Sequence, residues 1–277
     1  MNIAFAGLRH SHIFVLYAMA KENPLYRIVG AFEEDPESKA QAQAQGVACN
    51  YPTYDALLAD PEVEVVALGG CYGDRGGMAI RALKALYESG ALGEINNVYF
   101  GGQHPLQYGR RPMWYFEAGK HGGVINDIAI HGIDALAYAL DLHTDKILAA
   151  RTWNKFAAEQ PGFKESGQLM LSAQNGAGIM ADVSYAIPDG VEFALPYYWQ
   201  FYIWGTKGVI RFSLNDEKAY YYLAGKAEPI ELEEKEIEAD YLTDFHRFVT
   251  GQGDTVLPME DVFRATRATL TIQKAAN

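Results

Sequence analysis

The sequence is poor in cysteine and in basic residues, and it has no long apolar run. Its 277 residues include two cysteines, Cys49 and Cys71, too few for a disulfide framework and consistent with a reducing cytoplasm. Lysine and arginine number 23 against 35 acidic residues, a formal net charge of -12, so we expect neither nucleic acid nor a membrane surface as a partner. No apolar stretch approaches membrane-spanning length, and residues 3–6 are too short for a signal peptide. We therefore expect a cytoplasmic protein.

Clustered metal ligands are also scarce. His10 and His12 have a spacing that could suit a metal on a strand, but no carboxylate or cysteine lies near them, so we expect no metal. The chain does have length and apolar content. With 49% hydrophobic residues, it can form two domains with a substantial core.

The first third of the chain alternates short apolar strands with helices. Strands are predicted at residues 2–6, 27–32 and 64–68, and short links join them to the helices between them. This alternation is typical of a parallel sheet. We expect residues 1–85 to form an incomplete Rossmann-like dinucleotide-binding domain, because a complete one needs roughly three more strands for its second half.

The turn after the first strand is the candidate phosphate-binding turn. Arg9 and His12 stand where a dinucleotide fingerprint has its second and third glycines, so the motif alone is weak. Its context supports it, because a helix N-terminus follows as an anion site and Glu33 ends the second strand, where a ribose 2′-hydroxyl would be held. A simple tight turn and a solvated loop acid are the alternative. The cofactor-binding candidates are Gly7, Leu8, Arg9, His10, Glu33, Gly69 and Tyr72.

From residue 95 the pattern changes to alternating, aromatic-rich strands, which predicts a large, mainly antiparallel open sheet. Its exposed face is expected to carry aromatic side chains and to form a homo-oligomer interface, with a core position as the alternative. The side chains concerned are Tyr197, Tyr198, Trp199, Tyr202 and Trp204. We expect residues 86–257 to form a substrate-binding and oligomerisation domain, and a helix over 258–277 to pack back on the N-terminal domain. The predicted fold class is α/β, with a truncated Rossmann-like parallel sheet followed by an α+β domain.

Residues 122–134 carry the strongest candidate site. After two glycines, an apolar stripe at helical spacing opposes a polar stripe of Asp127, His131, Asp134 and Tyr138. Asp127 and His131 lie one turn apart on this stripe. Such a polar stripe is often only the solvated face of a surface helix. This one has no lysine or glutamate, which favours an acid/base pair. The two interpretations remain open on the pattern alone.

These residues together resemble the Gfo/Idh/MocA oxidoreductase family, which includes glucose-fructose oxidoreductase and inositol dehydrogenase. The resemblance covers almost the whole chain, and its most specific part is Gly-Gly, three residues, Asp, three residues, His. The matching segments are Gly7 with its helix, residues 33–37, residues 88–95, residues 122–134, and Glu260-Asp261. The resemblance implies a Rossmann domain that binds NAD or NADP and an open-sheet domain that supplies substrate contacts. It also implies that Asp127 and His131 hold the substrate hydroxyl and exchange its proton.

The sequence departs from the family in one segment. Family members have a Glu-Lys-Pro segment whose lysine completes the catalytic group, and this chain has no Lys-Pro dipeptide. By the size of one or two strand-helix units, about 50 residues are missing between Ala85 and Leu86. If the chain is continuous there, the helical spacing of its apolar residues predicts one helix from about Met78 to Glu88.

The expected function is hydride transfer between a nicotinamide cofactor and a sugar, polyol or related hydroxy compound. NAD is expected over NADP, because Glu33 and the two acids after it would repel a 2′-phosphate. Further substrate-binding candidates are Arg110, Trp114 and Lys120. The alternatives are a non-catalytic, truncated paralogue that acts as a ligand-binding or oligomeric protein, and an NAD-dependent glycosidase or epimerase on the same fold.

Overall fold

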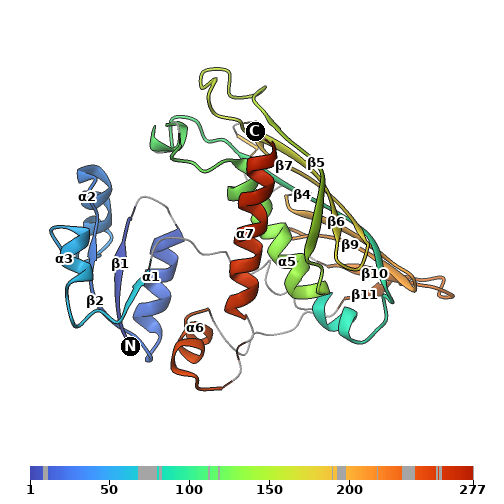
Figure 1. Ribbon diagram of the computed structural model, residues 1–277, viewed down its shortest axis with the longest axis horizontal. Helices are drawn as coiled ribbons and strands as arrows, with labels where there is room; N and C mark the ends of the chain where they lie inside the picture. Colours follow the sequence, from blue (N-terminus) through green and yellow to red (C-terminus); the bar gives the residue numbers. More distant parts are fainter. Residues whose placement is uncertain are drawn as a thin grey trace. The chain divides into compact units, whose positions relative to one another are not determined.

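The computed structural model separates into two compact units, which are described one at a time (Figure 1). The first contains Met1–Gly73 and Glu238–Val256, and the second contains Asp74–Ile237 and Leu257–Asn277. The structure describes residues 1–8, 12–67, 80, 83–111, 113–117, 119–188, 190–191, 198–216, 218–232, 241–253, 255 and 258–276.

The first unit is built on a parallel sheet with strand order β2-β1-β3. Its strands are β1 (Asn2–Ala6), β2 (Arg27–Phe32) and β3 (Val65–Ala67). The helices described with them are α1 (His12–Glu22), α2 (Pro36–Ala44) and α3 (Tyr54–Leu58). Apolar side chains of β1 and α1 form the core, with Phe5 and Ile13 fully buried. The predicted parallel arrangement is confirmed for the described strands.

A helix from late in the chain completes this unit. In α6 (Tyr241–Thr250), Leu242 is buried in the same core as Phe5. The Tyr26 hydroxyl donates to the Leu242 carbonyl at 2.6 Å, and the Asn23 side chain donates to Thr243 at 3.2 Å. The sequence placed this segment in the 86–257 domain, because local patterns do not show which distant core a helix joins.

The second unit is built on an eight-stranded sheet with order β11-β10-β9-β8-β4-β7-β6-β5. The strands are β4 (Ile95–Pro105), β5 (Thr144–Trp153), β6 (Ser166–Ala173), β7 (Gly178–Ile187), β8 (Gln200–Gly205), β9 (Gly208–Ser213), β10 (Tyr220–Leu223) and β11 (Ile230–Glu231). Neighbouring strands are antiparallel, except that β4 and β7 run parallel. The mainly antiparallel open sheet is therefore confirmed, whereas β11 was not predicted.

Helices cover one face of this sheet (Figure 1). They are the short 3-10 helix η1 (Met113–Phe116), the π-helix η2 (Ile125–Ala129), α5 (Ile130–Leu140) and α7 (Met259–Ala276). The predicted apolar stripe of residues 122–134 is buried, with Ile125, Ala129 and Ile133 at most 5% exposed. Gly132 permits close packing of α5 on β4, because a Cβ there would lie 2.3 Å from the Phe100 ring.

The C-terminal helix α7 lies beside α5 (Figure 1) and packs on η2, α5 and β5. Ala265 and Ile272 of α7 are buried in the core of the second unit. The expectation that this helix packs on the N-terminal domain differs from the observed packing, because its apolar face matches the helices around residues 122–134. No helix among the described residues is long and apolar enough to cross a membrane.

The chain is helical across the junction of Ala85 and Leu86. Residues 83–88 form a helix, and Ser89 N donates to the Ala85 carbonyl at 3.0 Å. Leu83 and Leu86 are buried in the core of the second unit. The prediction of a continuous helix is thus confirmed over these residues, whereas Met78 lies outside the described residues.

The aromatic residues near β8 divide between the two faces of the sheet. Trp199 is 3% exposed and stacks on Phe201 in the core, and Tyr198 packs against the same core. Tyr202 and Trp204 lie on the outer face and stack with their ring centroids 6.0 Å apart. The expectation of an exposed position was therefore wrong for Trp199, while Tyr197 lies outside the described residues.

Candidate active site

The turn before η2 positions Asp127. Gly122 and Gly123 have φ angles of 81° and 97°, which other residues rarely adopt. A Cβ on Gly123 would lie 2.2 Å from the Gln273 amide, so a side chain there would displace that amide from its present position. The Gln273 amide oxygen accepts from Ile125 N at 3.0 Å and satisfies a donor at the helix start. The last turns of α7 therefore fix the turn that carries Asp127.

Asp127 itself lies in a π-helical turn. Such turns widen the helix by one residue, are rare, and occur often at functional sites. His131 follows in the first turn of α5. In an α-helix, successive side chains are about 100° apart, and the sequence interpretation assumed this spacing. The wider π-helical turn changes the angle between the Asp127 and His131 side chains.

Three side chains converge on the Asp127 carboxylate. The hydroxyl of Tyr115 donates to Oδ2 at 2.7 Å, and the hydroxyl of Tyr185 donates to the same oxygen. His121 Nε2 lies 3.3 Å from this oxygen and 3.2 Å from the Tyr185 hydroxyl. Both tyrosines are buried and the His121 side chain is 8% exposed, whereas the Asp127 side chain remains 35% exposed. The carboxylate is thus anchored on one side and open on another.

A guanidinium group lies over the two tyrosine rings. The central carbon of Arg111 is 4.6 Å from the Tyr115 ring centroid and 4.9 Å from that of Tyr185, a cation-π geometry. Arg111 Nε also donates to the Leu106 carbonyl at 2.6 Å. Burial, followed by the negative charge of Asp127, raises the pKa of Tyr115, so its hydroxyl keeps its proton and remains a donor.

His131 reaches the same group of side chains through aromatic contacts. Its ring meets Trp199 edge to face with centroids 5.8 Å apart, and Trp199 meets His104 at 5.9 Å. His104 in turn lies 6.1 Å from Tyr185, which contacts Asp127. Asp127 and His131 therefore border one aromatic cluster on the helix-covered side of the sheet.

The remaining members of the predicted polar stripe point elsewhere. Asp134 is half-buried, and burial, followed by the charge of Asp261 on α7, raises its pKa to about 6. Tyr138 contacts Lys84, whose ammonium lies 5.2 Å from the ring centroid. The stripe is thus neither a fully solvated face nor one continuous site.

Of the three further substrate-binding candidates, Trp114 lies closest to the Asp127 cluster. Its ring centroid is 5.0 Å from that of Tyr115, and its buried indole N–H has no hydrogen-bond partner among the described residues. Arg110 and Lys120 are exposed. Their predicted roles stay predictions.

In the first unit, Glu33 joins two turns. It is 3% exposed, and its carboxylate accepts from Leu8 N at 2.5 Å and from Asp35 N at 2.8 Å. Gly7, with a φ of 78°, starts the first of these turns. Both Glu33 oxygens thus accept from backbone N–H groups, and the contact of Glu33 with a ribose hydroxyl stays a prediction. Four other cofactor candidates, Arg9, His10, Gly69 and Tyr72, lie outside the described residues.

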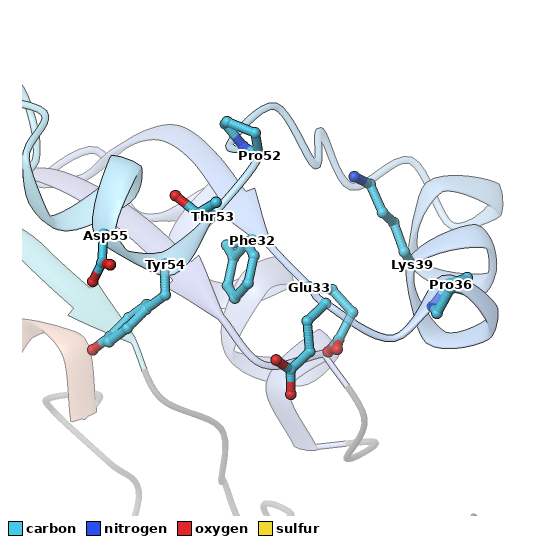
Figure 2. Close-up of a pocket in the computed structure, with 9 residues that line it drawn as sticks. Phe32, Glu33, Pro36, Lys39, Pro52, Thr53, Tyr54 and Asp55 are labelled. Carbon is cyan, nitrogen blue, oxygen red and sulfur yellow. The ribbon is translucent and has the colours of Figure 1, made fainter.

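A cleft of about 570 Å³ lies beside the end of β2. In Figure 2, Lys39 of α2 and Tyr54 of α3 lie on either side of Phe32 and Glu33. The lining residues are Phe32, Glu33, Glu34, Pro36, Lys39, Pro52, Thr53, Tyr54 and Asp55. A cleft at the carboxyl end of a parallel strand suits the adenosine half of a dinucleotide.

Tyr115, His121 and Tyr185 were not predicted from the sequence. His121 immediately precedes the glycine pair, which was a usable signal. Tyr115 and Tyr185 are 12 and 58 residues away from Asp127, and no local pattern connects them with it. Among the residues that the structure describes, no group of three or more metal-ligating side chains is placed to hold a metal ion.

A family model described as the GFO/IDH/MocA C-terminal domain matches residues 80–211. No curated protein sequence matches the chain.

Several solved structures share the fold over the whole chain. A candidate oxidoreductase from Erwinia carotovora atroseptica SCRI1043 has a TM-score of 0.83 at 20% identity, covering 100% of this chain and 99% of the other. An oxidoreductase from Agrobacterium radiobacter, in complex with NAD+, L-tartaric acid and magnesium, has a TM-score of 0.71 at 20% identity, covering 100% and 95%. Aldose-aldose oxidoreductase from Caulobacter crescentus, complexed with glycerol, has a TM-score of 0.72 at 15% identity, covering 100% and 97%. At these identities the likeness shows the fold.

Proposed function

This chain carries the C-terminal domain of the Gfo/Idh/MocA family, and we propose that it is an oxidoreductase that uses a nicotinamide cofactor on a sugar, a polyol or a related hydroxy compound. The match confirms the family resemblance of the sequence. The observation that carries the proposal is the Asp127 carboxylate, anchored by three side chains and still 35% exposed, in the domain that supplies substrate contacts in this family. The NAD+ and glycerol bound by similar structures support the chemical class.

In this proposal His131 and Asp127 divide the work on the substrate hydroxyl. An imidazole titrates near neutrality, so His131 accepts the hydroxyl proton as general base. The ionised Asp127 accepts a hydrogen bond from the same or a neighbouring hydroxyl and orients it. A nicotinamide cofactor, when bound, supplies the hydride acceptor or donor.

The cofactor proposed is NAD rather than NADP. Glu34 and Asp35 follow the buried Glu33, and Glu34 lines the cleft beside β2. Their negative charges disfavour a 2′-phosphate, whereas Lys39 on the same cleft attracts one. Titration of the chain with both nucleotides tests the balance, and tighter binding of NADP would show that Lys39 outweighs the acids.

A second function is supported by a specific observation. The described parallel sheet has three strands, and the chain has no Lys-Pro dipeptide. These two features favour a paralogue that binds a ligand or assembles through its open sheet without redox turnover.

Cofactor binding and turnover together separate the two functions. The experiment measures calorimetric binding of NAD to the full chain and then NADH formation with a panel of polyols and sugars, for wild type and His131→Ala. We expect turnover that falls by roughly 100-fold or more in His131→Ala, because general-base catalysis contributes about that much. The thermal midpoint should not change. Binding without turnover in the wild type would support the non-catalytic paralogue, and unfolding of His131→Ala would identify a structural core histidine.

A further inference from the structure

The hydrogen atoms around Asp127 Oδ2 can be counted. Each tyrosine hydroxyl has one hydrogen, and those of Tyr115 and Tyr185 both point to this oxygen. The Tyr185 oxygen can then only accept at its contact with His121 Nε2, 3.2 Å away. If Nε2 had no hydrogen, it would face the lone pairs of a carboxylate and of a phenol at close range. The hydroxyl oxygens of Tyr115 and Tyr185 also lie 3.0 Å apart. When both hydroxyl hydrogens are directed to Asp127, the only hydrogen left for the two contacts of Nε2 is one on Nε2 itself.

We propose that Nε2 of His121 carries a hydrogen and that His121 acts as a positioning residue, which fixes the Asp127 carboxylate by donating toward Asp127 Oδ2 and the Tyr185 oxygen. Its catalytic consequence rests on the proposed function, whereas the hydrogen-bond assignment does not.

The surroundings of His121 hold its ring in one orientation. The ring centroid lies 4.5 Å from that of Tyr115 and 4.9 Å from that of Phe163. Low exposure removes competing water, so hydrogen bonds within this group are stronger than at the surface. Phe163 also lies 5.6 Å from Tyr185, which encloses the two side chains together.

A fixed, negatively charged Asp127 carboxylate favours some ligand groups over others. Three donors fix the position of Asp127, and the guanidinium over both tyrosine rings favours its negative charge. A hydroxyl group donates to such a carboxylate, whereas a carboxylate ligand at the same point would be repelled. His121 therefore favours hydroxyl groups at the position next to Asp127. The Asp127 orientation then depends on the donor at position 121 and not on the volume of that side chain.

Two variants at position 121 distinguish the effect of the hydrogen-bond donor from the effect of side-chain volume. His121→Gln keeps an N–H group, and His121→Leu fills the space without a donor. We expect His121→Leu to lower kcat by roughly 10- to 100-fold with a smaller change in KM, because small displacements of an orienting group cost about this much. His121→Gln should retain most of the wild-type kcat. Equal losses in both variants, or a better His121→Leu, would overturn the proposal.

A spectroscopic measurement tests the hydrogen bond without turnover. In the full chain labelled with nitrogen-15, a hydrogen-bonded imidazole N–H resonance should appear downfield and should couple to Nε2 of His121. It should disappear in His121→Leu and shift or broaden in Asp127→Asn, while the control His246→Gln keeps it. If wild type shows this resonance but no turnover, the proposed function fails and the hydrogen-bond assignment stands. A His121 resonance on Nδ1 alone, or one insensitive to Asp127→Asn in a folded variant, refutes the assignment.

Discussion

The carboxylate of Glu33 links the turn after β1 to the turn after β2. Its two acceptor atoms serve Leu8 N and Asp35 N, and Asp35 in turn caps α2 by accepting from Ser38 N at 2.8 Å. One buried side chain therefore aligns the two turns that border the carboxyl ends of β1 and β2. Hydrogen bonds of this type, from backbone N–H to an ionised group, contribute about 1.5–3 kcal/mol each.

The first prediction concerns Glu33→Gln. An amide group replaces one oxygen with a donor, so one of the two backbone N–H groups loses its acceptor in a buried position. We expect the free energy of unfolding of this unit to fall by roughly 1–3 kcal/mol in urea titrations. The exposed neighbour Glu34→Gln is the control and should change it by less than about 0.5 kcal/mol. A Glu33→Gln chain as stable as the control would mean that solvent reaches these N–H groups.

Single residues of the candidate site were only partly predictable. Asp127 and His131 stand out because their spacing after two glycines is visible in the sequence. Tyr185 could not be found in this way, because it lies on β7 and meets Asp127 only when β7 packs against η2. Glu33 was recognised from its position at the end of β2, but no pattern shows that backbone N–H groups already occupy both oxygens.

At the scale of elements, α5 and α7 face each other with two acidic side chains. Asp134 on α5 is half-buried, and Asp261 lies near the start of α7. Burial first, and the Asp261 charge second, raise the pKa of Asp134 from 3.8 to about 6. The folded state therefore holds a proton on Asp134 more tightly than the unfolded state does. Stability from this group is present below about pH 4 and is lost as the pH rises through about 6.

The second prediction follows from the raised pKa of Asp134. Asp134→Asn removes the charge that is costly above pH 6, so it should stabilise the chain at pH 8 by roughly 1–3 kcal/mol, since each pKa unit corresponds to about 1.4 kcal/mol. At pH 4 the carboxyl is largely protonated and the substitution should have little effect. Thermal unfolding at both pH values measures the difference, with the exposed Asp145→Asn as control. Equal effects of Asp134→Asn at the two pH values would contradict the raised pKa.

Elements with a clear period were predicted, and those that depend on distant packing were not. The alternating strands of the large sheet and the apolar stripe of α5 follow from local patterns. The parallel pairing of β4 with β7 does not, because it brings together strands separated by other elements. The hydrogen bond from Ile125 N at the start of η2 to Gln273, near the other end of the chain, could not be predicted either. The packing of α6 in the first unit was not predicted for the same reason.

At the scale of the whole molecule, the two units differ in the size of their described sheets. The described part of the first has a three-stranded sheet, whereas the second has an eight-stranded sheet with helices on one face. The strand register shows what the other face of the large sheet carries. Met170 pairs with Met180, Met180 with Tyr99, and Tyr99 with Tyr202, so these side chains lie in one row across four strands.

The last prediction concerns this outer face. Met170, Met180 and Trp204 are 44%, 54% and 41% exposed, although contiguous apolar side chains on a monomer are usually covered by a partner. A second copy of the chain is the proposed partner, because a flat sheet face can pair with itself about a twofold axis. Sedimentation equilibrium should give a mass at least twice 30.7 kDa for the wild type. Met180→Glu should shift this mass towards the monomer, because it places a charge in the row. The exposed Met113→Glu, outside the sheet, should leave the mass unchanged, and a monomeric wild type would remove the argument for pairing through this face.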